Sequence, residues 1–307
     1  MNRTHLTALI LLLTAAATRP APAQTHLSYE RIENVIYGRK FGTALTMDVF
    51  RPTRANGAGV IFLVSGGWLS SRDTPNMVTI RLESFQSFLD RGYTVFAVVH
   101  GSQPKFIIPE IIQDLHRSVR FIRHEAAKYG VNPQRLGITG SSSGGHLALM
   151  IAAQGAPGSP VARDPIDRES SAVQAAACFF PPTDFLNWGG PAIDGVGVGT
   201  MAPIKAAFGP RADTAESRQV YGREISPSYF ITSNLPPVVM IHGDLDPTVP
   251  LQQSELFIKR AREAGASIPK LVVRPGKGHG WGDFWKSDED LQVFCDWFDQ
   301  HLRNDSK

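Results

Sequence analysis

The sequence of 307 residues is poor in cysteine and in net charge, and each shortage argues against a class of protein. Its two cysteines, Cys178 and Cys295, can form neither a disulfide framework nor a cysteine-based metal site. We expect free thiols, because one falls in a predicted buried strand and the other in a predicted helix, although an exported protein could join them. Charged residues make up 19% of the chain and the formal net charge is +3. The pI of about 8.9 therefore gives no argument for a nucleic-acid partner.

Long apolar runs are also scarce, and the one that stands out, Leu6–Ala17, follows the basic Arg3 and precedes an Ala-Pro-Ala site at positions 21–23. This order is typical of a secretory signal peptide. We predict that residues 1–23 are removed and that 24–307 is periplasmic or secreted, with no stable membrane span. A retained membrane anchor is the alternative, but a spanning helix needs about 20 apolar residues. Cleavage removes two of the 31 basic residues and none of the 28 acidic ones, leaving a net charge near +1.

Apolar runs of strand type alternate with helical patterns along the rest of the chain. The predicted strands are Asn34–Tyr37, Leu45–Phe50, Val60–Val64, Thr94–Val99, Leu136–Thr139, Ala175–Phe179, Val238–Ile241 and Lys270–Arg274. The predicted helices are Ile80–Arg91, Ile111–Tyr129, Gly144–Gln154, Leu251–Ala264 and Asp290–Leu302. A hairpin followed by strand–helix units indicates an α/β protein with one mostly parallel, eight-stranded sheet and helices on both faces.

One segment, Phe185–Arg223, breaks this alternation. It is rich in glycine and proline, and it also carries apolar residues such as Trp188 and Phe208. Long connections of this kind are often covers over a site, so we predict a lid-like insertion at 185–223, with packing against the domain as the alternative. Its glycine run Gly195–Gly199 lacks the strand-then-helix setting of a dinucleotide-binding loop.

The stretch Gly140-Ser141-Ser142-Ser143-Gly144 fits the pattern G-x-S-x-G between a predicted strand and a predicted helix. In that setting the central serine, Ser142, is held at a sharp turn where only small neighbours fit. The unpaired N–H groups at the start of the helix, that of Ser143 among them, face any developing negative charge. We therefore predict that Ser142 is a nucleophile; a serine- and glycine-rich helix cap is the plainer interpretation.

A serine hydroxyl needs a base, and the base needs an orienting acid. His279 stands between glycines after the last predicted strand, where catalytic groups of open α/β sheets gather. Asp246 follows the preceding strand, with Asp244 and, more weakly, Asp184 as competitors for the acid. Other histidines are expected to be structural or solvated. They are His116, His124, His146, His242 and His301.

Four motifs together, VSGGW, GSSSGG, HGDLDPTVP and GKGHGW, resemble the carboxylesterases of the α/β-hydrolase superfamily from about residue 60 to the C-terminus. The relevant branches are the hormone-sensitive-lipase-like and the feruloyl or acetyl-xylan esterases, and secreted members fit the N-terminal pattern. The resemblance implies the α/β-hydrolase fold and a triad of Ser142, His279 and Asp246.

The resemblance also implies an oxyanion loop, usually His-Gly-Gly-Gly-Trp, which here reads Val64-Ser65-Gly66-Gly67-Trp68. The histidine and the first glycine are replaced. The N–H groups of Gly66 and Gly67 would form the oxyanion hole with that of Ser143. A tight turn after the strand would use the same glycines.

These residues predict a serine carboxylesterase that cleaves short acyl esters, on small molecules or carbohydrates, through an acyl-enzyme and without a cofactor. The sequence has no metal-binding motif such as H-E-x-x-H. A serine peptidase and a non-catalytic binding protein on the same scaffold are the alternatives. The candidates for the substrate pocket are Trp68, Trp188 and Trp281.

Overall fold

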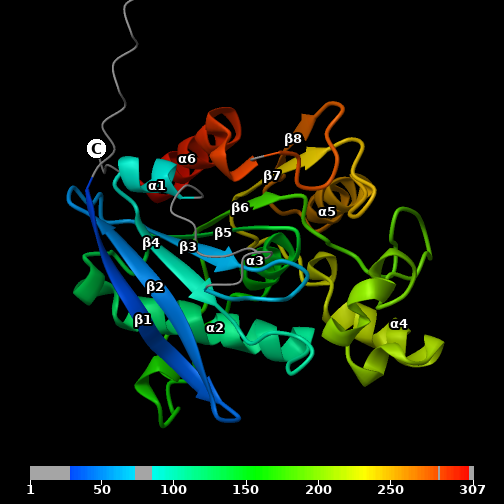
Figure 1. Cartoon of the computed structure of the whole chain (residues 1–307), viewed down its shortest axis with the longest axis horizontal. Coiled ribbons are helices and arrows are strands. Elements are labelled where there is room, and N and C mark those ends of the chain that lie inside the picture. The colour runs from blue at the N-terminus through cyan, green and yellow to red at the C-terminus, as the bar shows by residue number, and fades with distance from the viewer. Residues whose placement is uncertain (1–27, 73–84, 283, 304–307) are drawn as a thin grey trace, which may run out of the picture.

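The computed structural model describes residues 28–72, 85–282 and 284–303, and in it one eight-stranded sheet lies between two layers of helices (Figure 1). The predicted α/β class is confirmed. The predicted signal peptide and the start of the predicted helix Ile80–Arg91 lie outside the described residues. The strands are β1 (Tyr29–Lys40), β2 (Thr43–Pro52), β3 (Gly59–Val64), β4 (Thr94–Val99), β5 (Leu136–Ser141), β6 (Ala175–Phe179), β7 (Val238–Gly243) and β8 (Lys270–Arg274).

The strands are ordered β1-β2-β4-β3-β5-β6-β7-β8. The hairpin of β1 and β2 pairs antiparallel with β4, and the other neighbours are parallel. The carboxyl ends of β3, β5, β6, β7 and β8 therefore meet at one edge of the sheet, where an open α/β sheet builds its site. The first predicted strand, Asn34–Tyr37, was too short, because β1 continues on both sides of Asn34 through an irregular register.

The helices cover both faces because the residues of the central strands alternate between two apolar cores. Ile61 and Leu63 pack into the core under α2, α3 and α5, and Val60 and Phe62 pack into the core under α1 and α6. The α-helices are α1 (Gln86–Asp90), α2 (Ile108–His124), α3 (Ser143–Gln154), α4 (Ala215–Glu224), α5 (Gln252–Glu263) and α6 (Asp288–Leu302). The predicted helix Ile111–Tyr129 starts earlier than expected, at a proline-containing first turn, and its last residues form the 3₁₀ turn η2 (Ala126–Tyr129).

The segment Phe185–Arg223 contains two 3₁₀ helices, η4 (Gly199–Ala207) and η5 (Pro210–Ala212), and most of α4. Figure 1 shows α4 on the side of the domain toward which the arrows of β3 and β4 point. Several apolar side chains of the segment join the core shared with α3, which gives it a packed base. They are Phe185, Leu186, Trp188, Val196, Met201 and Phe208. Within the described residues, no helix is both long and apolar enough to cross a bilayer.

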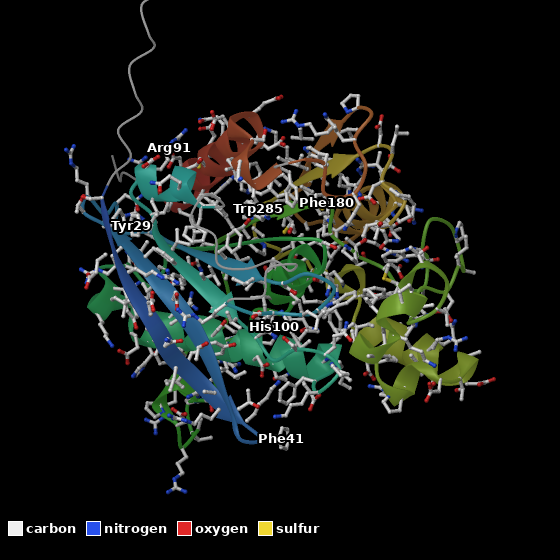
Figure 2. The ribbon with its side chains drawn as sticks, in the orientation of Figure 1. Tyr29, Phe41, Arg91, His100, Phe180 and Trp285 are labelled. Atoms are coloured by element: carbon white, nitrogen blue, oxygen red, sulfur yellow. The ribbon has the colours of Figure 1, made fainter. Side chains whose placement is uncertain are left out.

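Two histidines inside the domain make its stability depend on pH. Burial lowers the pKa of His100, labelled in Figure 2, and of His146 from about 6.5 to about 4. Between these two values the unfolded chain binds protons that the folded protein does not, so the free energy of unfolding should fall as the pH drops from about 6.5 to 4. The loss is of the order of 3 kcal/mol for each histidine.

Urea unfolding at pH 7 and pH 4.5 measures this effect. His100→Gln should flatten the dependence of the free energy of unfolding on pH, because it removes one of the two buried imidazoles whose pKa is lowered to about 4. If the free energy of unfolding fell by the same amount between pH 7 and pH 4.5 in the wild type and in His100→Gln, His100 would not be a source of the pH dependence.

Candidate active site

Ser142 sits at the turn between β5 and α3 in a backbone conformation that few residues adopt. Its φ is 52° and its ψ is −120°, and its N–H donates to the carbonyl of Phe179 at 3.0 Å. The turn is tight: a Cβ on Gly140 would lie 2.5 Å from the backbone of Gly144. Positive φ is strained for any residue with a side chain, and such strain gathers at functional sites. Gly140 is thus required by the turn that presents Ser142.

His279 and Asp246 lie in line with this serine. His279 Nε2 is 3.0 Å from Ser142 Oγ, and its Nδ1 is 2.7 Å from Asp246 Oδ2. Because Nδ1 faces a carboxylate and donates to it, Nε2 is left to accept the serine proton. The structure therefore brings together three side chains that are far apart in the sequence, with the contacts that nucleophilic attack by a serine needs.

The buried side chain of Asp246 is held as a carboxylate. Although its burial opposes ionisation, donors from His242 and His279 and the backbone N–H of Val249 keep the pKa of Asp246 below its usual range. The N–H groups of Thr248 and Val249 each donate to Oδ1 at 2.8 Å. A negative charge fixed next to His279 stabilises the imidazolium that forms when the base takes up a proton.

The two competitors for the acid are engaged elsewhere. Asp244 is exposed, and its Oδ1 accepts the N–H of Gly276 at 2.6 Å. Asp184 is fully buried and accepts hydrogen bonds from the N–H of Leu186, from Asn187 and from the hydroxyl of Tyr229. Asp184 therefore fixes the base of the segment Phe185–Arg223 and has a structural role.

The loop after β3 separates the two glycines that the sequence had left equivalent. The N–H of Gly66 donates to the carbonyl of Leu69 at 3.0 Å, and the N–H of Leu69 returns the bond. Gly66 therefore closes a tight turn, and the expectation that its N–H forms part of the oxyanion hole is corrected. Within the described residues, the N–H of Gly67 has no acceptor. Gly67 and Ser143 remain as the candidate pair of donors.

Residues after β4 hold this loop in place through hydrogen bonds. The side-chain amide of Gln103 donates to the carbonyl of Gly67 at 3.1 Å, and its backbone N–H donates to the carbonyl of Trp68 at 3.3 Å. Ser70 and Ser102 exchange two further bonds between the same segments. These hydrogen bonds could not be predicted from the sequence, since residues 102 and 103 match no motif.

Two of the three tryptophans expected in a substrate pocket are buried instead. Trp68 is 1% exposed and Trp188 is 5% exposed. The ring of Trp188 stacks on that of Phe185 at 5.5 Å, and Trp68 packs against Phe185 and Phe208. Both rings therefore fill the base of the segment Phe185–Arg223 and are not placed to contact a substrate.

Trp281 is partly exposed and belongs to a group of rings around His279. Its ring lies 5.5 Å from that of Phe180, which in turn lies 4.6 Å from the His279 imidazole. Phe180 and Trp285 are labelled in Figure 2. Phe180 has a positive φ of 33° although its side chain is bulky. Phe180 belongs to no sequence motif, although its place directly after β6, at the carboxyl end of a strand, is a usable signal.

The remaining histidines have buried or surface roles. His146 accepts from Trp68, and His116 contacts Ser171. His242 Nε2 lies 2.8 Å from the carbonyl of Val249 and 3.5 Å from Asp246, so it supports the loop that carries the acid. Both cysteines are buried and unbonded. In the described part of the chain, no group of three or more histidine, cysteine or acidic residues could hold a metal ion.

The profile of the BD-FAE family matches residues 47–260, a span from β2 to α5 that includes the loop after β3, the serine turn and the acid loop. Among curated proteins, the chain is similar to esterase LipQ of Mycobacterium tuberculosis (27% identity over 76% of this chain and 54% of LipQ). It is also similar to an ethyl acetate hydrolase of Pseudomonas putida (25% identity over 85% of this chain and 80% of the hydrolase). The chain thus spans about half the length of LipQ.

The fold has counterparts among solved structures. A truncated carbohydrate esterase from gut microbiota superposes with a TM-score of 0.75 and 24% identity, covering 91% of this chain and 98% of the esterase. At this level of identity the likeness shows that the fold is shared.

Proposed function

The chain belongs to the BD-FAE family of α/β-hydrolase esterases, and we propose that it is a serine carboxylesterase. The observation that carries the proposal is the continuous contact from Asp246 through His279 to Ser142 at 2.7 and 3.0 Å. The esterase and ester hydrolase names of its relatives support the same chemistry.

In the proposed reaction, Ser142 Oγ attacks the ester carbonyl while His279 Nε2 takes up the hydroxyl proton. The N–H groups of Gly67 and Ser143 then stabilise the negative oxygen of the tetrahedral intermediate. The alcohol leaves with the proton from His279, and the acyl group remains on Ser142. A water molecule, activated by the same imidazole, releases the acid and restores the serine.

We propose esters with a short acyl group as substrates, on small alcohols or on carbohydrates. Support comes from the segment Phe185–Arg223: a Cβ on Gly67 would lie in van der Waals contact with Ile204 Cγ2, at 3.7 Å. This side chain of η4 therefore approaches the candidate oxyanion donor and limits the space beside it. A small pocket discriminates against added methylenes by about 1–3 kcal/mol each.

The experiment compares kcat/KM for p-nitrophenyl acetate, butyrate and octanoate, with a matched panel of peptide substrates. We expect acetate and butyrate to be cleaved at least about tenfold faster than octanoate, and the peptides to be left intact. Ile204→Ala should raise the relative rate on octanoate. Ile193→Ala, which removes a 52% exposed side chain of the same segment, should not. A wild-type preference for octanoate would contradict the short-acyl proposal, and cleavage of the peptides alone would favour a peptidase.

We also propose that residues 1–23 direct export and are removed. The basis is the sequence pattern alone, an apolar run followed by an Ala-Pro-Ala site. N-terminal sequencing of the protein recovered from outside the cytoplasm should begin at Gln24, whereas a start at Met1 in a membrane fraction would favour a retained anchor.

A further inference from the structure

The loop after β3 is tied to α3 on both sides of its glycine pair. Before the glycines, Ser65 Oγ lies 3.0 Å from Ser143 Oγ. After them, the indole N–H of Trp68 donates to His146 Nδ1 at 3.2 Å. All four side chains are buried. Ser143 and His146 are three residues apart in one helix and therefore share a face. The two residues that flank Gly66 and Gly67 in the loop are thus each hydrogen-bonded to a side chain of α3.

The pair of Trp68 and His146 has defined hydrogen-bond roles. His146 Nε2 lies 2.6 Å from the carbonyl of Ile225, so this nitrogen carries the proton and Nδ1 is free to accept. A neutral imidazole is needed for these two roles. Burial beside the ring of Phe185 lowers the pKa of His146 to about 4, so the imidazole is neutral near pH 7. Trp68 has a positive φ of 58°. A bulky residue keeps that conformation only when its contacts hold it there.

The two candidate oxyanion donors come from different elements. The N–H of Gly67 belongs to the loop after β3, and the N–H of Ser143 belongs to the first turn of α3. Both must lie about 3 Å from a single oxygen atom, so a small change in their separation weakens the stabilisation of the transition state. Side chains that join the loop to the helix therefore act on the separation of the two donors.

We propose that Ser65, Ser143, Trp68 and His146 are positioning residues that set the distance between the N–H groups of Gly67 and Ser143. This inference rests on the proposed function, since it assigns these pairs to the oxyanion hole of that reaction. The hydroxyl of Ser143 then has a second task, separate from that of its backbone N–H. The four side chains do not touch the reacting atoms and act only through the loop and the helix turn.

A double-mutant cycle tests the serine pair. Ser65→Ala and Ser143→Ala each remove one hydroxyl and keep the backbone N–H. Each should lower kcat for p-nitrophenyl acetate by about tenfold with little change in KM. The double variant should lose no more than either single one, because all three lack the same hydrogen bond. Affinity for a trifluoromethyl ketone, which forms the oxyanion, should fall by the same factor as kcat/KM.

Ser118→Ala is the matched control, since it removes another buried hydroxyl, one that donates to the carbonyl of Leu115 within α2. It should leave kcat and ketone affinity unchanged. Trp68→Phe keeps an aromatic ring and removes the indole N–H, so it tests the second pair. It should also lower kcat and ketone affinity together, with KM nearly unchanged.

Two results would overturn the inference. One is that Ser65→Ala and Trp68→Phe keep the wild-type kcat and ketone affinity although their thermal midpoints are lower. The other is that the factor by which kcat falls in the double serine variant equals the product of the factors in the two single variants. The first would assign the pairs to stability alone. Failure of the proposed function would look different, because the wild-type protein itself would then hydrolyse no ester and form no adduct with the ketone.

Discussion

Ser142→Ala should lower kcat for ester hydrolysis by at least about 10⁴-fold while the folded structure remains. Alanine removes the one oxygen that lies 3.0 Å from His279 Nε2 and introduces no bulk at the turn. The loss is large because the base and the acid have no nucleophile to activate. Initial rates with p-nitrophenyl acetate, together with circular dichroism and the free energy of unfolding, measure both parts of this expectation.

The neighbouring serines provide matched controls, since each hydroxyl has a different partner. Ser141 Oγ accepts the indole N–H of Trp285 at 3.3 Å, and Ser143 Oγ pairs with Ser65. Ser141→Ala should therefore keep nearly wild-type activity, and Ser143→Ala should lose no more than the about tenfold expected from its contact with Ser65. A loss of the same size in all three variants would refute the choice of Ser142 as nucleophile and indicate damage to the turn itself.

Asp246→Asn should lower kcat by about 10⁴-fold, with a much smaller effect on KM. The amide is neutral, so it no longer stabilises the imidazolium of His279. It can also donate to Nδ1, which favours the tautomer that carries its proton on Nε2 and cannot accept from the serine. The backbone donors of Thr248 and Val249 would meanwhile still hold the loop in place. Pre-steady-state rates with an activated ester measure the effect on acylation directly.

The controls for the acid are Asp244→Asn and Asp184→Asn. Asp244 is exposed and accepts a hydrogen bond from the N–H of Gly276. Asp184 accepts hydrogen bonds from backbone and side-chain groups of the segment Phe185–Arg223. Asp244→Asn should leave kcat nearly unchanged, and Asp184→Asn should lower stability more than kcat. If either variant lost more activity than Asp246→Asn, the acid would have to be reassigned.

The parts of the fold that sequence predicts well are those with local signals. The turn Gly140–Gly144 is recognisable because an apolar strand, small residues and a helical pattern follow each other directly. Each strand from Val60–Val64 onward was expected within about one or two residues, because buried parallel strands read as apolar runs. β1 was harder, since its exposed positions do not follow the strict alternation typical of a strand and its register shifts between Ile32 and Val35 and again between Ile36 and Gly38.

Other features depend on contacts between distant segments and leave no local signal. The position of β4 between β2 and β3 is a matter of topology. Gly66 and Gly67 cannot be told apart in the sequence. The structure distinguishes them, because the N–H of Gly66 is bonded to the carbonyl of Leu69 and the N–H of Gly67 is not. Trp68 and Trp188 have the composition of a binding site but pack inside, because Phe185 and Phe208 cover them. The role of a large ring is therefore decided by its neighbours in space.

The proposed chemistry depends on one reactive serine, Ser142, and reaction with a fluorophosphonate followed by peptide mass mapping tests its reactivity. The wild-type protein should gain a single phosphonyl group on the peptide that carries Ser142, and hydrolysis of p-nitrophenyl acetate should disappear in proportion. Ser142→Ala should gain none. A phosphonyl group on another serine, or full hydrolysis after complete modification of Ser142, would rule out Ser142 as the nucleophile.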